Sequence, residues 1–152
     1  MANSFRDLQR AQLDSALQLW RDAQLPARPA GGWVRAIREA LGMSATALGK
    51  RLGMSHVGVA KLERSEAEDT ISLTSLRKLA NALDCELQYA LVPRVSLETK
   101  LQARAQQIAR ERIAPVAHSM SLEAQTVQAS AMQKQIDLLA SQLLRGPARE
   151  LW

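Results

Sequence analysis

Serine and glycine divide the middle of the chain into short helical segments. Ser44 and Ser55 each precede a run of helix-forming residues, and Gly53 lies between the two runs. Serine is a preferred residue at the start of a helix, and glycine readily adopts the positive φ angle that ends one. The spacing predicts helices over 45–52 and 56–66. Two short helices joined by a tight turn have the geometry of a helix-turn-helix.

Most of the remaining sequence is also helical in pattern. Apolar residues recur at three- and four-residue steps, which is the period of one face of a helix. We predict further helices over 4–22, over 33–41, from Ser72 or Thr74 to about Leu83, from Ser96 to about Ile113 with a break at Pro115, and over 121–145. Aromatic residues make up only 3% of the chain, which favours a mostly α-helical protein over a β-sandwich or barrel.

One segment departs from the helical period. Apolar and more polar residues alternate along 85–92, directly before Pro93. Alternation with a period of two predicts a short β-strand. A single strand in an otherwise helical chain needs a partner strand, and a second copy of the protein is a simple source.

The charge of the chain is unevenly distributed. Residues 28–64 hold seven basic and two acidic side chains, whereas residues 65–86 hold two basic and five acidic ones. A basic segment followed by an acidic one is typical of a protein with a cationic face. Binding of a polyanion is one reading of this pattern, and a patchy solvated surface is the other.

Several classes of protein are excluded by the sequence. No apolar run approaches the ~20 residues of a membrane span, and the charged N-terminal segment does not resemble a signal peptide. We therefore expect a cytoplasmic protein, and the lone Cys85 fits a reducing compartment. No set of convergent titratable groups and no metal-ligand spacing occurs, so we expect no enzyme, no metal and no cofactor.

A spaced set of residues runs through the two predicted helices and their flanks, followed by LTSLRKLANALD: Arg38, Gly42, Ser44, Leu48, Gly53, Ser55, Val59 and Glu63. In this set, residues 32–92 resemble the Cro/repressor-type (XRE-like) helix-turn-helix family. The usual pattern of that family is an Arg, then G-x-S-Q, x-x-L-A, a G-x-S turn, an aliphatic residue and E-x-G, and LTSLRKLANALD matches the helix that follows. The chain departs from the pattern at Ala45, Gly49 and Ser65, where the family has Gln, Ala and Gly.

The resemblance implies that the second helix of the motif enters the major groove of DNA. Contacts with base edges are then expected from His56, Val57, Gly58 and Lys61. Contacts with phosphates are expected from Ser44, Thr46, Ser55, Arg64 and Arg77. The alternative for His56 and Arg77 is an ordinary solvated surface position. The resemblance also implies that Arg38 and Glu63 form a partly buried ion pair between the first helix and the recognition helix.

The motif is accompanied by an N-terminal helix, the run ALDCELQYALVPR and a C-terminal helix pair ending in Leu151-Trp152. This architecture resembles the mobile mystery protein A family. It implies an antitoxin that represses its own operon and binds a Fic-domain toxin. Residues 119–124 approach the inhibitory S/T-x-x-x-E-G/N segment of Fic regulation, with Glu123 as the inhibitory residue and Ala124 in place of Gly or Asn. The alternative is a stand-alone repressor of phage or mobile-element type without a toxin partner.

The predicted fold class is mostly α, with a lambda-repressor-like helix-turn-helix domain that carries one short strand. We expect an N-terminal amphipathic helix at 1–27, the DNA-binding domain at 28–93 and a C-terminal helix pair at 94–152 for dimerisation and partner binding. A homodimer would present two recognition helices ~34 Å apart to a palindromic operator. Either the strand or the C-terminal helices would form the dimer interface, and the alternative for both is an intramolecular core.

Overall fold

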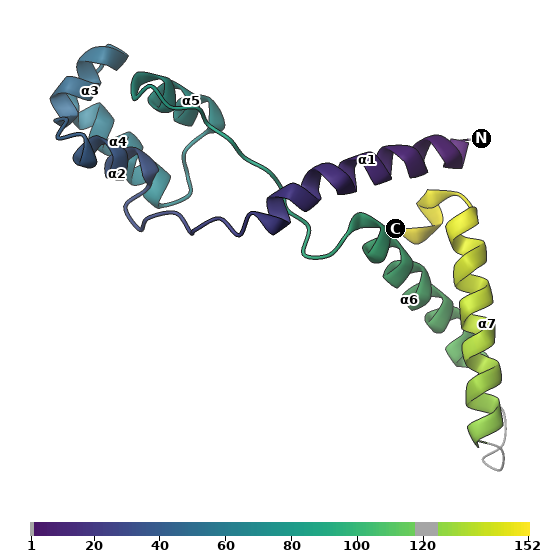
Figure 1. Ribbon diagram of the computed structural model, residues 1–152. Coiled ribbons are helices and arrows are strands. Elements are labelled where there is room, and N and C mark those ends of the chain that lie inside the picture. The colour runs from purple at the N-terminus through teal and green to yellow at the C-terminus, as the bar shows by residue number, and fades with distance from the viewer. Residues whose placement is uncertain (1, 118–124) are drawn as a thin grey trace. The chain divides into compact units, whose positions relative to one another are not determined.

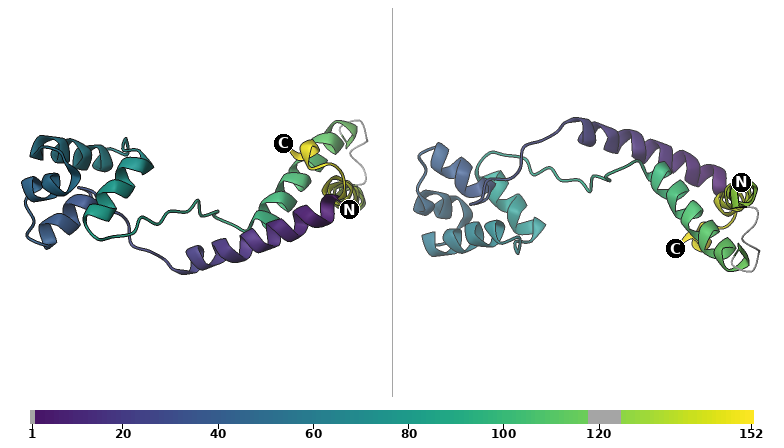
Figure 2. Two further views of the ribbon diagram at one scale, coloured as in Figure 1. Left: turned by 90° about the horizontal axis from the view of Figure 1, so that it is seen from above. Right: turned by 90° about the horizontal axis from the view of Figure 1, so that it is seen from below.

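The computed structural model describes residues 2–117 and 125–152, which form helices connected by irregular segments (Figures 1 and 2). The helices are α1 (Ala2–Asp22), α2 (Trp33–Ala40), α3 (Ala45–Leu52), α4 (His56–Ala67), α5 (Leu73–Ala82), α6 (Leu97–Ala117), α7 (Gln125–Arg145) and the short 3-10 helix η1 (Ala148–Leu151). The chain forms two compact units: the central unit, Leu25–Ala90, and the terminal unit, Met1–Gln24 with Leu91–Trp152. None of the described helices combines the length and the apolar character that crossing a bilayer requires.

The helices of the central unit begin at the serines that the sequence marks. The hydroxyl oxygens of Ser44, Ser55 and Ser72 each accept a hydrogen bond from a backbone N–H three residues further on, at 3.1, 3.2 and 3.1 Å. Gly53 ends α3 in the left-handed conformation, with φ 68°. The predicted helices over 45–52 and 56–66 are confirmed, because the local capping signals agree with the apolar pattern.

The core of the central unit lies where its helices meet. Leu48 of α3, Val59 of α4 and Leu79 of α5 are fully buried in one hydrophobic cluster. The remaining buried hydrophobic residues of this core are Val34 and Leu83. Each helix of the motif therefore turns one apolar face inward, which leaves the other face to solvent.

The start of α2 is capped from a distant helix. The carboxylate of Glu66 in α4 accepts hydrogen bonds from the backbone N–H groups of Trp33 at 2.7 Å and Val34 at 3.0 Å. Gly32 precedes α2 with φ 87°, and a Cβ atom there would lie 2.7 Å from Glu66 Oε2. Glycine at this position leaves room for the carboxylate, and the buried Glu66 ties α2 to α4.

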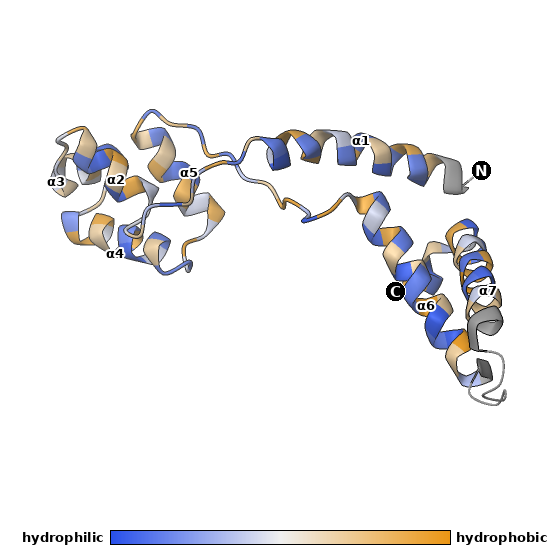
Figure 3. Cartoon of the chain, turned by 60° about the horizontal axis from the view of Figure 1, so that its bottom comes forward, coloured by the Kyte–Doolittle hydropathy of each residue, from blue (hydrophilic) through white to orange (hydrophobic). Residues whose placement is uncertain are grey.

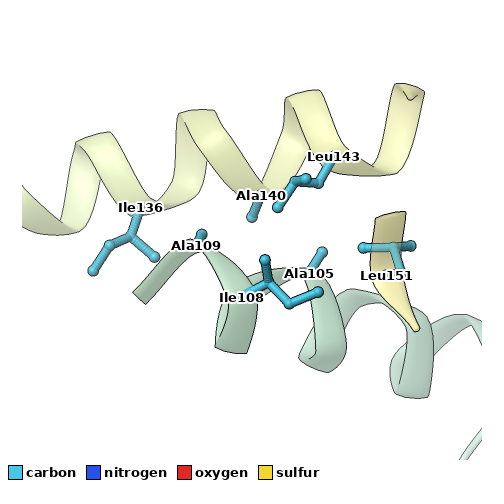
Figure 4. Packing of buried hydrophobic residues seen from close by; sticks show 7 residues of the cluster. All are labelled: Ala105, Ile108, Ala109, Ile136, Ala140, Leu143 and Leu151. Atoms are coloured by element: carbon cyan, nitrogen blue, oxygen red, sulfur yellow. The ribbon is translucent and has the colours of Figure 1, made fainter. Parts of the chain in front are cut away.

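In the terminal unit, α6 and α7 pack on each other over a shared apolar core. Figure 4 shows its residues: Ala105, Ile108 and Ala109 of α6, Ile136, Ala140 and Leu143 of α7, and Leu151 of η1. Alanine on both helices allows their backbones to approach closely. Arg104 of α6 also donates a hydrogen bond to the carbonyl oxygen of Leu151 at 2.7 Å, which holds η1 against α6.

Helix α1 belongs to the same unit and contacts the start of α6 through polar side chains. The carboxylate of Asp14 accepts hydrogen bonds from the backbone N–H groups of Leu97 at 2.6 Å and Glu98 at 3.1 Å. Arg10 pairs with Glu98 at 2.7 Å and with Asp7 at 2.8 Å. Asp14 thus satisfies N–H groups that have no partner inside α6.

Two details of the sequence prediction are wrong, although the mostly helical fold is confirmed. Residues 85–92 form no strand, because the described ranges offer no second strand with which they could pair. Helix α6 does not break at Pro115 but continues to Ala117. Proline in the last turn of the described helix removes only a hydrogen bond near its end, so the helix tolerates it there.

Candidate nucleic-acid interface

Helix α4 has one buried face and one exposed face. Val59 is fully buried and Glu63 is 6% exposed, so these positions face the core of the central unit. Val57 and Lys61 are exposed on the other side of the same helix, and His56 is exposed at its first residue. Val57 keeps 63% of its surface in solvent, although it is an aliphatic residue. Of the predicted base-contacting residues, the structure therefore places Val57 and Lys61 on the outward face of α4 and His56 at its exposed start.

Gly58 is the fourth residue predicted to approach DNA bases, and it is partly buried. Its backbone N–H donates to the hydroxyl of Ser55 at 3.2 Å. A Cβ atom on Gly58 would lie 3.3 Å from the sulfur of Met54, which is the flexible end of a side chain. The atoms nearest to a Cβ at Gly58 thus belong to a side chain that can move, so the packing of the protein itself does not require glycine at this position.

Most of the predicted phosphate-contacting residues are exposed on the two helices of the motif. Ser44 and Thr46 lie at the start of α3, Ser55 precedes α4, and Arg64 lies further along α4. The two serine oxygens accept hydrogen bonds from backbone N–H groups, and each hydroxyl hydrogen remains able to donate to a phosphate oxygen. Helix starts also carry unpaired N–H groups and positive potential, which favour an anion.

Arg77 lies on α5, outside the two helices of the motif. Its guanidinium group lies 6.0 Å from the centre of the Tyr89 ring, which is a long cation–π contact. The side chain is exposed, so both of the roles considered for it, a phosphate contact and a solvated charge, remain compatible with its position.

Arg38 and Glu63 form a two-point ion pair between α2 and α4. Arg38 Nε donates to one carboxylate oxygen of Glu63 at 2.6 Å, and Nη2 donates to the other at 3.1 Å. The third nitrogen, Nη1, donates to the carbonyl oxygen of Met43 at 2.9 Å. The side chains are only 12% and 8% exposed. The hydrogen bond to Glu63 raises the pKa of Arg38, so the guanidinium group stays charged.

The turn between α3 and α4 depends on a residue to which the motif analysis assigns no role. Gly49 is buried, and a Cβ atom there would lie 2.5 Å from the backbone carbonyl oxygen of Met54. The backbone N–H of Met54 donates back to the Gly49 carbonyl oxygen at 2.9 Å. The only signal in the sequence is that Gly49 stands where the family pattern has Ala.

Two further contacts that hold this surface in place have no local signal. Arg51 at the end of α3 donates to the carbonyl oxygen of Ala82 at the end of α5, at 2.9 Å. Glu66, described above, joins α4 to the start of α2. Each contact joins residues more than thirty positions apart, so the motif spacing does not predict it.

The residues predicted for other kinds of site are placed as follows. Glu123 lies outside the described residues. Within residues 2–117 and 125–152, no group of three His, Cys, Asp or Glu side chains is arranged to hold a metal ion. Cys85 is a partly buried free thiol whose Sγ contacts the carbonyl oxygen of Leu83 at 3.4 Å.

Comparison with known proteins agrees with this geometry. Residues 34–89 match the family model described as Helix-turn-helix. No curated protein and no solved structure matches the chain. The matched segment begins in α2 and includes α3, α4, α5, the Gly53 turn and the Arg38–Glu63 pair. Residues 34–89 are therefore a helix-turn-helix domain, which supports a DNA-binding transcription regulator.

Proposed function

We propose that the protein binds specific DNA sequences by placing the start of α4 in the major groove. The observation that carries this proposal is the two-faced character of α4. Its inner face is fixed by the buried Val59 and Glu63, while His56 and Val57 are exposed at its first turn. A recognition helix contacts base edges with its N-terminal side chains, and the rest of the domain holds it at a fixed angle.

Each side chain in the proposed set suits one kind of base contact. Lys61 can donate to O6 and N7 of guanine, and Val57 can contact the methyl group of thymine. His56 can donate or accept, and its neutral form is sufficient for this. Gly58 lets the backbone of α4 come close to the bases. Discrimination between sequences then comes from the first two turns of α4.

The phosphate contacts orient the domain and are independent of sequence. In this proposal Ser44 and Thr46 at the start of α3, Ser55 before α4 and Arg64 on α4 contact the DNA backbone, and their exposure supports this role. Arg77 on α5 is the one member of the set outside the two helices of the motif. The excess of basic residues over 28–64 predicts that binding weakens as salt is raised, because condensed counterions are released on binding.

Replacing Lys61 with alanine should weaken operator binding by about 1–3 kcal/mol and relax the preference at one base pair. The measurement is fluorescence anisotropy with the promoter region of the protein's own gene, with single-base variants of it and with a scrambled duplex. Lys100→Ala, which removes an exposed lysine from α6 in the terminal unit, is the control and should leave the affinity unchanged. An equal loss on all duplexes would make Lys61 a phosphate contact. A wild-type protein that binds the scrambled duplex as well as the promoter would contradict sequence-specific recognition.

We further propose that this regulator is an antitoxin, which autorepresses its operon and binds a Fic-domain toxin. The support is the likeness of the flanking segments to the mobile mystery protein A family and the sequence of residues 119–124. Glu123→Ala is expected to abolish restraint of the toxin's nucleotide transfer without weakening promoter binding, and Glu123→Gln tests whether the charge is needed. The readouts are co-purification of the full chain with the tagged product of a neighbouring Fic gene and the transfer activity. Absence of any complex would favour a stand-alone repressor.

A further inference from the structure

Helix α1 contacts α6 through polar side chains, and much of its apolar surface is left exposed, although Leu17 and Trp20 are partly buried. Asp14 and Arg10 make the contacts with the start of α6. Phe5 precedes Asp14 by nine residues, about two and a half turns, so the two side chains project from opposite sides of α1. This arrangement is the reverse of the usual one, in which an amphipathic helix buries its apolar face in its own domain.

The apolar side of α1 is correspondingly exposed. The large members of this surface, which we call the α1 stripe, are Phe5 at 67%, Leu8 at 58%, Leu13 at 51% and Leu19 at 74% exposed. Figure 3 shows hydrophobic residues recurring along the helix. If a large apolar side chain presents roughly 150–250 Å², the stripe leaves on the order of 500 Å² of apolar surface open per copy. A contiguous patch of that size marks an interaction surface more often than an idle one.

Among the residues whose burial is described, the C-terminal helices leave no comparable run of large apolar side chains exposed. Their apolar faces are used within the chain, because α6 and α7 bury them against each other and against Leu151. The strand expected at 85–92 is also absent from the described chain. Of the surfaces considered for self-association, α1 is the one whose apolar face has no partner among the described residues of its own unit.

We propose that the α1 stripe is the homodimer interface and that its occupant is the α1 stripe of a second copy. The residues between its members on the same side of the helix are Gln9, Gln12 and Ala16, none of which is charged. A two-fold interface places a surface against its own copy, so a charge within it would face a like charge. The neutral stripe meets this requirement.

The area and the rigidity of α1 also fit this occupant. Two stripes together would bury roughly 1,000 Å², which is near the lower limit for a specific protein interface. The contacts of Asp14 and Arg10 hold α1 in place on α6 before any partner arrives, which reduces the entropy lost on association. The inference rests on the proposed function in one respect: a dimer is useful to a DNA-binding protein because two copies are needed to read the two halves of a palindrome.

The test compares the self-association of the full chain with that of a double variant, Leu8→Glu with Leu13→Glu. Sedimentation velocity over a concentration series should show a reversible wild-type dimer and at least ~10-fold weaker association of the double variant. Leu138→Glu on α7 is the matched control, because Leu138 is 63% exposed and lies outside the stripe. All three substituted residues are exposed, so circular dichroism should show the same helix content in every protein.

Each outcome decides the proposal. A wild-type protein that stays monomeric overturns it, and so does a double variant that dimerises as well as the wild type; a monomer would point to the chain's own central unit or a different protein as the occupant.

Promoter binding separates this result from the proposed function. A monomeric double variant should keep weak binding to a half-site and lose the tighter binding to the palindrome. If the stripe variant alone is monomeric but neither protein prefers the promoter, the interface stands and the proposed function fails.

Discussion

Replacing Glu63 with alanine is expected to lower the free energy of unfolding by about 3–5 kcal/mol. The change leaves the guanidinium group of Arg38 in a site where only 12% of its side chain reaches water. One of its three donors keeps a partner, the carbonyl oxygen of Met43, and the other two lose the carboxylate. The loss is large because the buried charge keeps its desolvation cost without the interaction that offsets it.

The control for this prediction is Arg35→Ala, which removes an ion pair of similar length at the surface and leaves Glu39, 3.8 Å from Arg38 Nη2, in place. Glu39 pairs with Arg35 at 2.8 Å, and the two side chains are 53% and 58% exposed. The hydrogen bond from Arg35 lowers the pKa of Glu39, but solvent screens this pair, so the expected loss is much smaller than that of Glu63→Ala. Urea denaturation of both variants measures the difference. Equal losses of unfolding free energy in the two variants would show that the buried Arg38–Glu63 pair contributes no more to stability than an exposed pair does.

The parts of the fold that the sequence predicts well are those with local causes. Ser44, Gly53 and Ser55 act on backbone groups within a few residues, so their positions alone predict where α3 begins and ends and where α4 begins. The outward direction of Val57 and Lys61 follows from the same helical period, once Leu48 and Val59 are assigned to the core, whereas His56 is exposed because it is the first residue of α4. Whether His56, Val57 and Lys61 contact bases is a separate question, which depends on DNA and stays a prediction.

The parts that sequence analysis misses depend on contacts between distant residues. Asp14 caps the start of α6 across a separation of 83 and 84 residues, and Glu66 caps the start of α2 across 33 and 32 residues. A carboxylate that accepts N–H groups from another helix has no spacing by which it can be recognised. The N-terminal helix therefore reads as a separate region, although α1 and α6 belong to one compact unit.

The alternation over 85–92 shows how a pattern can have more than one cause. Cys85 and Leu87 are partly buried, whereas Tyr89 and Leu91 are exposed. The first half of the segment thus places alternate side chains inward without a hydrogen-bonded partner strand. A period of two describes which side chains are covered, and a strand requires in addition a neighbour that supplies the backbone hydrogen bonds.

Substituting alanine for Gly49 and for Gly58 should change stability in opposite directions. Glycine-to-alanine changes inside a helix usually stabilise by about 0.5–1 kcal/mol, because alanine has the better helix propensity. Gly58→Ala should follow this rule, since the nearest atom is the movable sulfur of Met54 at 3.3 Å. Gly49→Ala should instead destabilise by about 2–3 kcal/mol, because the new methyl group would lie 2.5 Å from a backbone oxygen.

The reason for the difference lies in what must move. At Gly49 the obstacle is the main chain of the turn, and relieving the clash requires α3 and α4 to separate. Gly49→Ala is therefore also expected to weaken promoter binding by the protein that remains folded, since the angle at which α4 is presented changes. Thermal unfolding and anisotropy titrations at a temperature well below the transition measure the two effects. A Gly49→Ala protein as stable as Gly58→Ala would mean that the turn accepts the alanine of the family pattern, and that the close approach at Met54 does not set the geometry of the motif.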